Sequence, residues 1–115
     1  SQRMSKEENL GEFEQLALLA VLRLGKHAYG ARIQEELEDR SGRKASVSSI
    51  YITLTRLEEK GMVSSRMGEP TGVRGGKARR FFQVEPKGVE ALERARNQLM
   101  AMWEGVRPAP EGTGP

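Results

Sequence analysis

Apolar residues recur with the period of an α-helix over three successive segments of the chain. Over residues 10–24 they step by three and four positions, and residues 16–22 are apolar on nearly every side. A helix without a polar face is buried on several sides, so in a small protein its extra side is available to a partner subunit. A second helix is predicted over residues 28–40. A third is predicted after Ser46, whose hydroxyl can accept a hydrogen bond from a free amide at the helix start, and it ends at Gly61.

After the third helix the pattern shortens to the period of a β-strand. Residues 62–66 and 79–84 are predicted as two short strands, joined by a glycine-rich hairpin tip. Pro86 then suits the first turn of a final helix. The apolar positions of that helix follow the spacing of a coiled-coil seam and are Leu92, Ala95, Leu99, Met102 and Val106. Three helices, a two-stranded ribbon and a closing helix outline a winged helix-turn-helix.

These elements predict a mainly α fold of the α+β kind, a winged helix-turn-helix with a C-terminal dimerisation helix. The expected organisation is a flexible lead-in at 1–8, the winged unit at 9–85, the dimerisation helix at 86–106 and a disordered tail at 107–115. We expect the first and last helices to form a homodimer. The candidates for its interface are Leu16, Leu19, Leu92, Ala95, Leu99 and Met102.

Composition narrows the classes of function. A chain of 115 residues is long enough for one domain. It has no cysteine and only one histidine, which excludes disulfides and thiolate metal sites, and we expect neither a metal nor a cofactor. No nucleophile–base pair and no phosphate-binding loop is found, which argues against an enzyme. No apolar run has the length of a membrane span and no signal peptide opens the chain, so a soluble cytoplasmic protein is expected.

The charged residues are unevenly distributed along the chain. The formal net charge is only +3, from 19 basic and 16 acidic residues. Residues 41–90 hold ten of the basic and five of the acidic residues, a net charge of +5, whereas residues 1–40 have a net charge of −2. A basic segment of this kind suggests a polyanionic partner, although the same side chains could simply solvate one face of the molecule.

The third helix and the hairpin carry side chains suited to double-stranded DNA. An α-helix fits the major groove, and residues near its start meet the base edges. The candidates on this helix are Ser48, Ser49, Thr53 and Arg56. From Pro70 to Val84 the hairpin holds four basic residues and no acidic one. Glycines allow the backbone to approach a phosphate, and a protruding arginine can enter the minor groove. The candidates on the hairpin are Arg74, Gly75, Gly76, Lys77 and Arg79.

Over residues 10–103 the chain resembles PadR-type transcriptional regulators. The residues that carry the resemblance are Leu18-Leu19-Ala20-Val21-Leu22, Ala28-Tyr29-Gly30, Ser46, Ile50-Tyr51, Thr53-Leu54, Arg56-Leu57-Glu58, Lys60-Gly61, Gly68-Glu69, Arg74-Gly75-Gly76, Arg80-Phe81-Phe82 and Pro86-Lys87-Gly88. The resemblance implies a dimeric bacterial repressor that binds a palindromic operator and is often released by a small ligand. The short C-terminal part is similar to that of the smaller members, which have a single helix there.

Three residues depart from the family pattern. Ile52 stands where the family often has proline, Ser48 where it often has glycine, and Glu85 where it often has threonine. The first two lie on the third helix, so the recognised DNA sequence does not carry over, while Glu85 could still cap the last helix. The resemblance adds Ser46 and Tyr51 to the candidate DNA-binding residues. It places the Tyr51 hydroxyl near the DNA backbone, whereas the apolar stripe places the ring in the core, and a tyrosine can do both.

Trp103, the only tryptophan, is the candidate contact for a small-molecule effector. In some small relatives, aromatic residues on this helix stack on flat ligands at the dimer interface, and packing within the interface is the competing interpretation. The leading hypothesis is a homodimeric transcriptional repressor that binds an inverted-repeat operator. The alternative is a winged-helix module that binds an acidic protein through its basic hairpin, without specific DNA binding.

Overall fold

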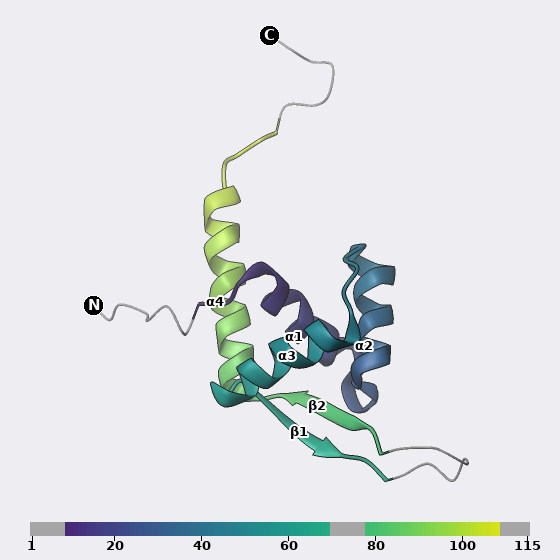
Figure 1. Cartoon of the computed structure of the whole chain (residues 1–115). Coiled ribbons are helices and arrows are strands. Elements are labelled where there is room, and N and C mark those ends of the chain that lie inside the picture. The colour runs from purple at the N-terminus through teal and green to yellow at the C-terminus, as the bar shows by residue number, and fades with distance from the viewer. Residues whose placement is uncertain (1–8, 70–77, 109–115) are drawn as a thin grey trace.

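The computed structural model describes residues 9–69 and 78–108. Along these residues the order of elements is α1 (Glu12–Leu24), α2 (Gly30–Glu36), α3 (Val47–Glu59), β1 (Val63–Met67), β2 (Arg80–Val84) and α4 (Pro86–Trp103). Two single turns flank α2, the 3-10 turn η2 (Gly25–His27) and the π-helical turn η3 (Leu37–Ser41). The strands form one antiparallel hairpin, which we call the wing. Figure 1 shows α1, α2 and α3 packed as one body, with the wing below it and α4 beside it. The predicted fold class, a mainly helical winged helix-turn-helix, is confirmed.

The hydrophobic core lies between α1, α2, α3 and the inner side of the wing. Its fully buried large side chains are Leu18, Val21, Ile33, Ile50, Leu54, Leu57 and Met62. From α3, the buried residues follow the predicted apolar stripe, while Val47 and Tyr51 at its edge are half-buried. Phe82 brings β2 into the core and Ala91 and Leu92 bring in the first turns of α4. Burial of these apolar surfaces is the main force that holds the elements together.

Both predicted ends of α3 are confirmed. The Ser46 hydroxyl accepts a hydrogen bond from the backbone N–H of Ser49 at 3.0 Å, and the Ser49 hydroxyl donates to the Ser46 carbonyl oxygen at 2.9 Å. These two bonds satisfy groups that a helix start leaves without intrahelical partners. At the other end the chain turns into β1 at Gly61, which has a φ of 80°.

The second helix is shorter than the pattern predicts. Tyr29 is extended and Ala28, with φ −87° and ψ 82°, is not helical either, because both residues pair with the edge of β2 that β1 leaves free. The Ala28 carbonyl oxygen accepts a hydrogen bond from the backbone N–H of Phe82 at 2.9 Å, and Tyr29 forms an antiparallel bridge with Phe81. Without this pairing the edge strand would present unpaired backbone groups. The pairing therefore decides the conformation of these two residues against their helical spacing.

The register of the wing assigns its side chains to two faces. Ser65 lies opposite Phe82, and Met67 lies opposite Arg80. Because side chains alternate along a strand, Ser65, Phe82 and Arg80 share the inner face, toward α3. Arg66 pairs with Phe81 on the other face, which we call the outer face of the wing.

The last helix begins at Pro86, as predicted, and ends at Trp103, so Val106 lies beyond it. Glu85 occupies the N-cap position, but its side chain makes no cap hydrogen bond. Its carboxylate instead accepts a hydrogen bond from the Ser64 hydroxyl of the neighbouring strand. The expected side-chain cap is therefore wrong, because a donor on β1 takes the carboxylate.

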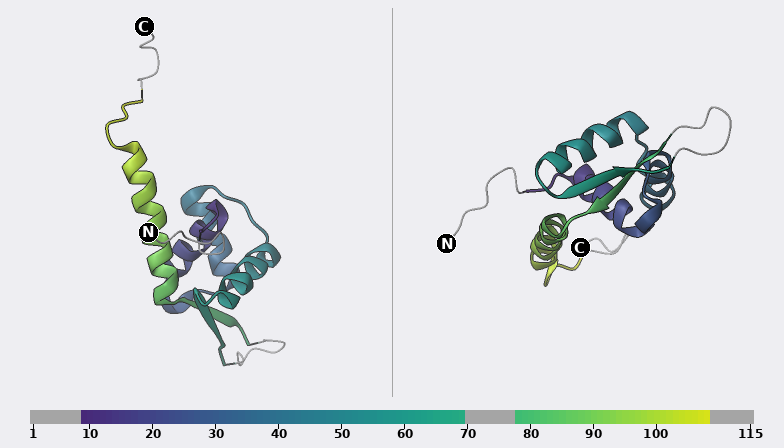
Figure 2. Two further views of the ribbon diagram at one scale, coloured as in Figure 1. Left: turned by 90° about the vertical axis from the view of Figure 1, so that its left-hand side faces the viewer. Right: turned by 90° about the horizontal axis from the view of Figure 1, so that it is seen from below.

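Beyond its first turns α4 leaves the body of the molecule. The left view of Figure 2 shows its C-terminal part projecting past α1, α2 and α3. No helix in the described part of the chain is both long and apolar enough to cross a membrane.

Gly88 sets how closely α4 approaches the wing. A Cβ atom at this position would lie 2.5 Å from the Met62 carbonyl oxygen and 2.8 Å from Cγ1 of Val84. Alanine within a helix is normally more stable than glycine by about 1 kcal/mol. We expect Gly88→Ala to reverse this sign and to lower the free energy of unfolding by about 1–3 kcal/mol through the clash. Urea denaturation followed by circular dichroism measures it.

The control for this prediction is Asn97→Ala, at an exposed position of the same helix. It is expected to leave the free energy of unfolding unchanged or slightly raised. A Gly88→Ala variant as stable as the unmodified protein would show that α4 does not dock this closely.

Candidate nucleic-acid interface

The side of α3 that faces away from the core carries three exposed residues four positions apart. They are Ser48, Ile52 and Arg56, and we call them the outer face of α3. Ser49 and Thr53 are half-buried at its border. The Ser49 proton is used in the helix cap, so its oxygen is left to accept hydrogen bonds rather than to donate one. The outer face of α3 thus offers a hydroxyl, an apolar side chain and a guanidinium to a partner.

The start of α2 and the start of α3 touch at Gly30. A Cβ atom there would lie 2.9 Å from Cγ1 of Val47 and 3.1 Å from the hydroxyl oxygen of Tyr51. The Tyr51 ring is half-buried and packs against Phe82 of the wing, with ring centroids 5.8 Å apart. The ring thus has the packing role expected from the apolar stripe, while the hydroxyl lies beside the start of α2.

Two arginines and two aromatic rings alternate on the outer face of the wing. The guanidinium carbon of Arg79 lies 4.3 Å from the ring centroid of Tyr29, and that of Arg66 lies 4.8 Å from the ring centroid of Phe81. The two rings meet edge to face at 5.5 Å. Such cation–π contacts hold an arginine in place while leaving its N–H groups free to donate. Both arginines are exposed.

Tyr29 and Arg66 were not predicted as part of the candidate interface. The four-residue spacing of Tyr29 from Ile33 and Leu37 placed it on the apolar face of a helix. The alternation of Arg79, Phe81 and Gln83 along β2 was the signal that could have pointed to a second, outer face of the wing.

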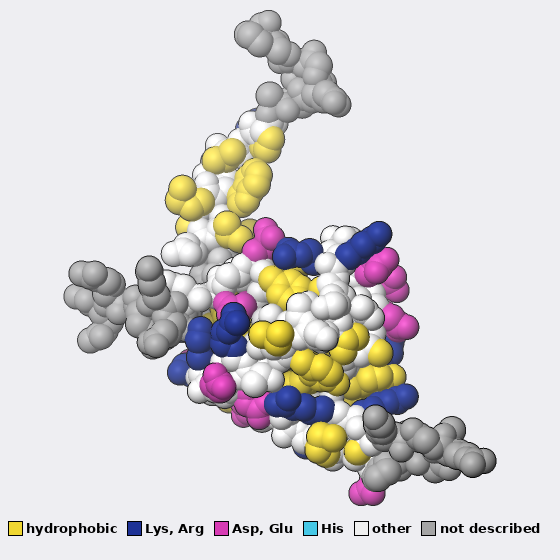
Figure 3. All heavy atoms as spheres, viewed as in Figure 1, with side chains coloured by type: hydrophobic (Ala, Val, Ile, Leu, Met, Phe, Trp, Pro, Cys, Tyr) yellow, Lys and Arg dark blue, Asp and Glu magenta, His cyan; other side chains and the backbone are white. Residues whose placement is uncertain are grey.

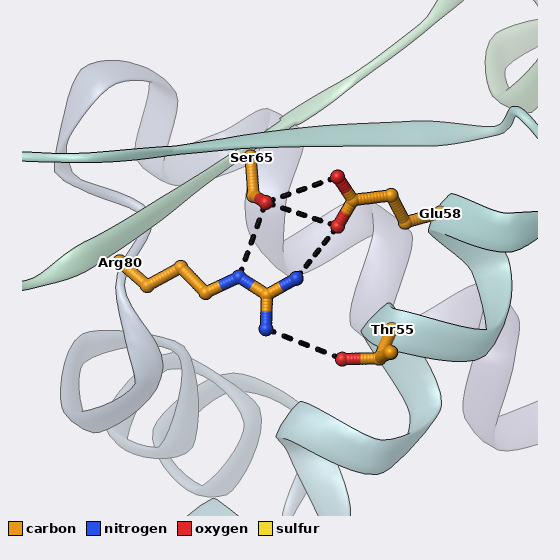
Figure 4. A network of polar contacts seen from close by, with 4 residues as sticks. All are labelled: Thr55, Glu58, Ser65 and Arg80. Carbon is orange, nitrogen blue, oxygen red and sulfur yellow. Dashed lines mark hydrogen bonds and ion pairs between the residues drawn. The ribbon is translucent and has the colours of Figure 1, made fainter.

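The inner face of the wing holds a polar network that joins it to α3 (Figure 4). The Arg80 guanidinium donates to the Glu58 carboxylate at 2.7 Å, to the Ser65 hydroxyl at 3.1 Å and to the Thr55 hydroxyl at 3.3 Å. The Ser65 hydroxyl is in turn within 3.0 Å of both Glu58 oxygens. Arg80 therefore connects the wing to α3, and the carboxylate of Glu58 neutralises its charge.

A second contact fixes the turn that precedes α3. Arg43 pairs with Glu12 at 3.1 Å and its guanidinium carbon lies 5.0 Å from the ring centroid of Phe13. Both partners belong to α1, so the entry into α3 is tied to the first helix. The Gln34 side-chain amide adds a bond from α2 to the Ala45 carbonyl oxygen at 2.9 Å.

Other charged groups contribute local ion pairs. A hydrogen bond to Glu35 raises the pKa of Arg32, which stays charged. Glu36 lies between two arginines, 2.8 Å from Arg23 and 3.6 Å from Arg40. Across residues 9–69 and 78–108, no three histidine, cysteine, aspartate or glutamate side chains lie together as metal ligands would.

The remaining hairpin residues lie outside the described part of the chain. These are Arg74, Gly75, Gly76 and Lys77, whose predicted contact with DNA stays a prediction. The expected lead-in at 1–8 also falls outside it, as does most of the expected tail.

The predicted dimer residues divide between the core and the surface. Leu92 is only 8% exposed and packs within the core of its own chain. Leu16 and Ala95 are half-buried. Leu19, Leu99 and Met102 are exposed, Met102 by 74%. Figure 3 shows apolar side chains along the part of α4 that projects from the body.

A groove of about 440 Å³ runs between α1 and α4. Its apolar lining residues are Leu19, Leu22, Val89, Leu92, Leu99, Met100 and Trp103, and Gln15, Glu93 and Arg96 add polar groups. Trp103 is 56% exposed and lies at the end of α4. The groove thus brings the tryptophan together with leucines of the first helix.

Three packed helices, followed by a basic antiparallel wing, define the chain as a winged helix-turn-helix protein. A transcriptional regulator from Clostridium thermocellum superposes with a TM-score of 0.65 at 19% identity, over 79% of this chain and 85% of that one. A PadR-like transcription factor from Bacteroides fragilis gives a TM-score of 0.65 at 24% identity, over 80% and 84%. Bacillus subtilis PadR in complex with operator DNA gives 0.60 at 21% identity, over 90% of this chain and 55% of that one. At these identities the likeness shows a shared fold.

The amino-acid sequence identifies a family within the winged helix-turn-helix proteins. The model of the transcriptional regulator PadR-like family matches residues 18–94, from the first helix to the middle of α4. The chain therefore belongs to the PadR-like family of transcriptional regulators. A comparison with curated proteins finds no match.

The network between Arg80 and Glu58 makes a prediction about stability. Both side chains are one-third exposed, so solvent weakens the pair, but the guanidinium also bonds two hydroxyls. In a double-mutant cycle of Arg80→Ala and Glu58→Ala we expect a coupling free energy of about 1 kcal/mol. Chemical denaturation of the four proteins measures it.

Arg66→Ala is the matched control, since Arg66 is an exposed arginine on the other face of the same hairpin. We expect this substitution to lower the free energy of unfolding by only about 0.5 kcal/mol, because it removes one exposed cation–π contact. Additive effects of the Arg80 and Glu58 substitutions would mean that the network does not hold the wing on α3.

Proposed function

We propose that the chain is a homodimeric DNA-binding repressor of transcription, which binds an inverted-repeat operator and is released by a small ligand. The observation that carries the proposal is that α3, whose outer face bears Ser48 and Arg56, packs against a wing that bears exposed arginines on its other face. The start of α2 connects the wing to α3. The ring of Tyr29 lies under Arg79 of the wing, and Gly30 lies close to Tyr51 of α3. Membership of a family of transcriptional regulators supports the same function.

In this proposal residues 9–85 form the DNA-binding unit. Helix α3 enters the major groove with Ser48, Ser49, Thr53 and Arg56 near the bases or phosphates, and Ser46 and Tyr51 lie at its edge. The wing follows the backbone with Arg79, and with Arg74, Gly75, Gly76 and Lys77 at its tip. The solved complex of Bacillus subtilis PadR with operator DNA supports this use of the fold. Phosphate contacts would supply much of the affinity, so binding is expected to weaken with salt.

The dimer is proposed to form through residues 86–106 and α1. The exposed apolar side chains of α4 and of α1 lie next to each other around one groove, and water is an unfavourable environment for so many of them. A two-fold axis would repeat the reading helix about 34–36 Å away, one turn of DNA along the same side, and would make the operator an inverted repeat.

Ligand release is proposed to act through the groove that contains Trp103. Its apolar lining and its single indole suit a flat apolar molecule, and any compound bound there would touch both α1 and α4. A repressor leaves its operator when the bound ligand favours a dimer whose two reading helices no longer fit both half-sites. Quenching of Trp103 fluorescence together with loss of DNA binding would identify such a compound.

The first test concerns the wing. Arg79→Ala is expected to weaken binding to a duplex from upstream of the gene by several-fold and to make the slope of log K against log salt shallower by about 1. Fluorescence anisotropy at several salt concentrations measures both. Arg94→Ala, an exposed arginine of α4 near the start of α1, is the matched control and is expected to change neither.

The outcomes separate the two candidate functions. An Arg79→Ala variant with the affinity and the salt slope of the unmodified protein would count against the proposed interface. If the unmodified protein binds no DNA even at low salt, a module for an acidic protein partner becomes the better explanation.

The second test concerns the dimer. Leu99→Glu places a charge on the exposed apolar seam of α4, where 57% of Leu99 is accessible in the single chain. We expect this variant to sediment as a monomer while keeping its helical circular dichroism, because a buried unpaired carboxylate is costly in an interface. Asn97→Glu adds the same charge to another exposed position of the helix and should remain dimeric. Sedimentation equilibrium distinguishes them, and a dimeric Leu99→Glu protein would remove α4 from the interface.

A further inference from the structure

Ile52 is an apolar residue in the middle of a polar surface. It is 59% exposed, the only large hydrophobic residue of α3 that is exposed. Its neighbours one turn before and one turn after are Ser48 and Arg56, both exposed. Glu59 adds a carboxylate near the end of the same helix, on the border of a shallow hollow that Ile52 also lines.

Packing within the chain does not explain this isoleucine. It belongs neither to the buried core nor to the half-buried residues packed against it. Ile50 and Leu54, two positions before and after it, are buried in the core on the opposite side of the helix. Isoleucine is also a weaker helix former than alanine, so helix formation does not favour it here. The apolar side chain is therefore left available for contact with a partner.

The chemistry of the surroundings selects the partner. Arg56 lies on the same face of α3 as Ile52, so this face favours an anionic partner such as DNA. Within the major groove of DNA, the apolar group that an aliphatic side chain can contact is the 5-methyl group of thymine. Ile52 is in the second turn of α3, the part of a reading helix that reaches base edges. The carboxylate of Glu59 repels phosphate near the C-terminal end of α3. We therefore place the contact with DNA in the first half of the helix.

We propose that Ile52 reads the 5-methyl group of a thymine in each half of the operator and so selects thymine over cytosine at that position. This assignment rests on the proposed DNA-binding function. It makes Ile52 a specificity-determining residue, whereas the exposed arginines add affinity for any sequence.

Replacement of single thymines by uracil tests the contact, because uracil lacks only the methyl group and pairs in the same way. The DNA is a duplex selected by the unmodified protein from a random pool, with each thymine of one half replaced in turn. A buried CH₂ group is worth about 0.8 kcal/mol, which corresponds to about a fourfold change in affinity. We therefore expect uracil at one thymine to weaken binding about fourfold.

The protein variant completes the cycle. Ile52→Ala should bind the thymine duplex severalfold more weakly and should be indifferent to uracil at that one position. Ser48→Ala, an exposed neighbour on the same face, is the matched control and should keep the full sensitivity to uracil. Thermal denaturation should show Ile52→Ala to be at least as stable as the unmodified protein, since the side chain packs against nothing in the core.

Each outcome has one meaning. Equal sensitivity to uracil in the Ile52→Ala and unmodified proteins would overturn the assignment, since another group would then read the methyl. Indifference of the unmodified protein to uracil at every thymine would overturn it as well. If no duplex is selected at all, the DNA-binding function itself fails, and the assignment fails with it.

Discussion

The pairing between the segment before α2 and the outer edge of β2 is the constraint on which the rest of the molecule depends. The hydrogen bond from the Phe82 N–H to the Ala28 carbonyl oxygen ties the wing to the helical body. It places the Phe82 ring in the core against Tyr51, and it sets Tyr29 beside Phe81 on the other face. A hairpin of two strands alone is only marginally stable in water, so this third strand-like contact, together with the network between Arg80 and Glu58, gives the wing a defined position relative to α3.

The basic residues of the wing divide into two kinds. Arg80 points to α3, where Glu58 and two hydroxyls use its donors and its charge. Arg79 and Arg66 point to the other side and rest on aromatic rings, which orient them and leave their hydrogen-bond donors available. Arg79 and Arg80 are adjacent in the sequence but contact different partners, because adjacent residues of a strand point to opposite faces. A count of positive charges along the hairpin overstates the number that can meet a phosphate.

Helix α4 has a different environment at each end. Its first turns approach the wing closely at Gly88 and bury Ala91 and Leu92, whereas its last turns expose Leu99, Met102 and Trp103. The apolar seam continues past the point where the chain's own body can cover it. A single copy of this chain is thus complete as a winged helix but leaves apolar surface on α1 and α4, which is the physical basis for the proposed dimer.

Local sequence determined much of the fold. The apolar stripe of α3, its serine cap, the two strands and the proline that opens α4 all depend on residues close in the chain, and each was predicted correctly. Part of the candidate interface followed in the same way, since the exposed positions Ser48 and Arg56 are those that the stripe leaves outside. Tertiary structure decided the rest. The non-helical conformation of Ala28 and Tyr29 and the hydrogen bond of the Glu85 carboxylate with Ser64 depend on partners distant in sequence. The commitment of Arg80 to Glu58 does so too. Local periodicity carries no information about such partners, because they meet only when the wing folds back onto the helices.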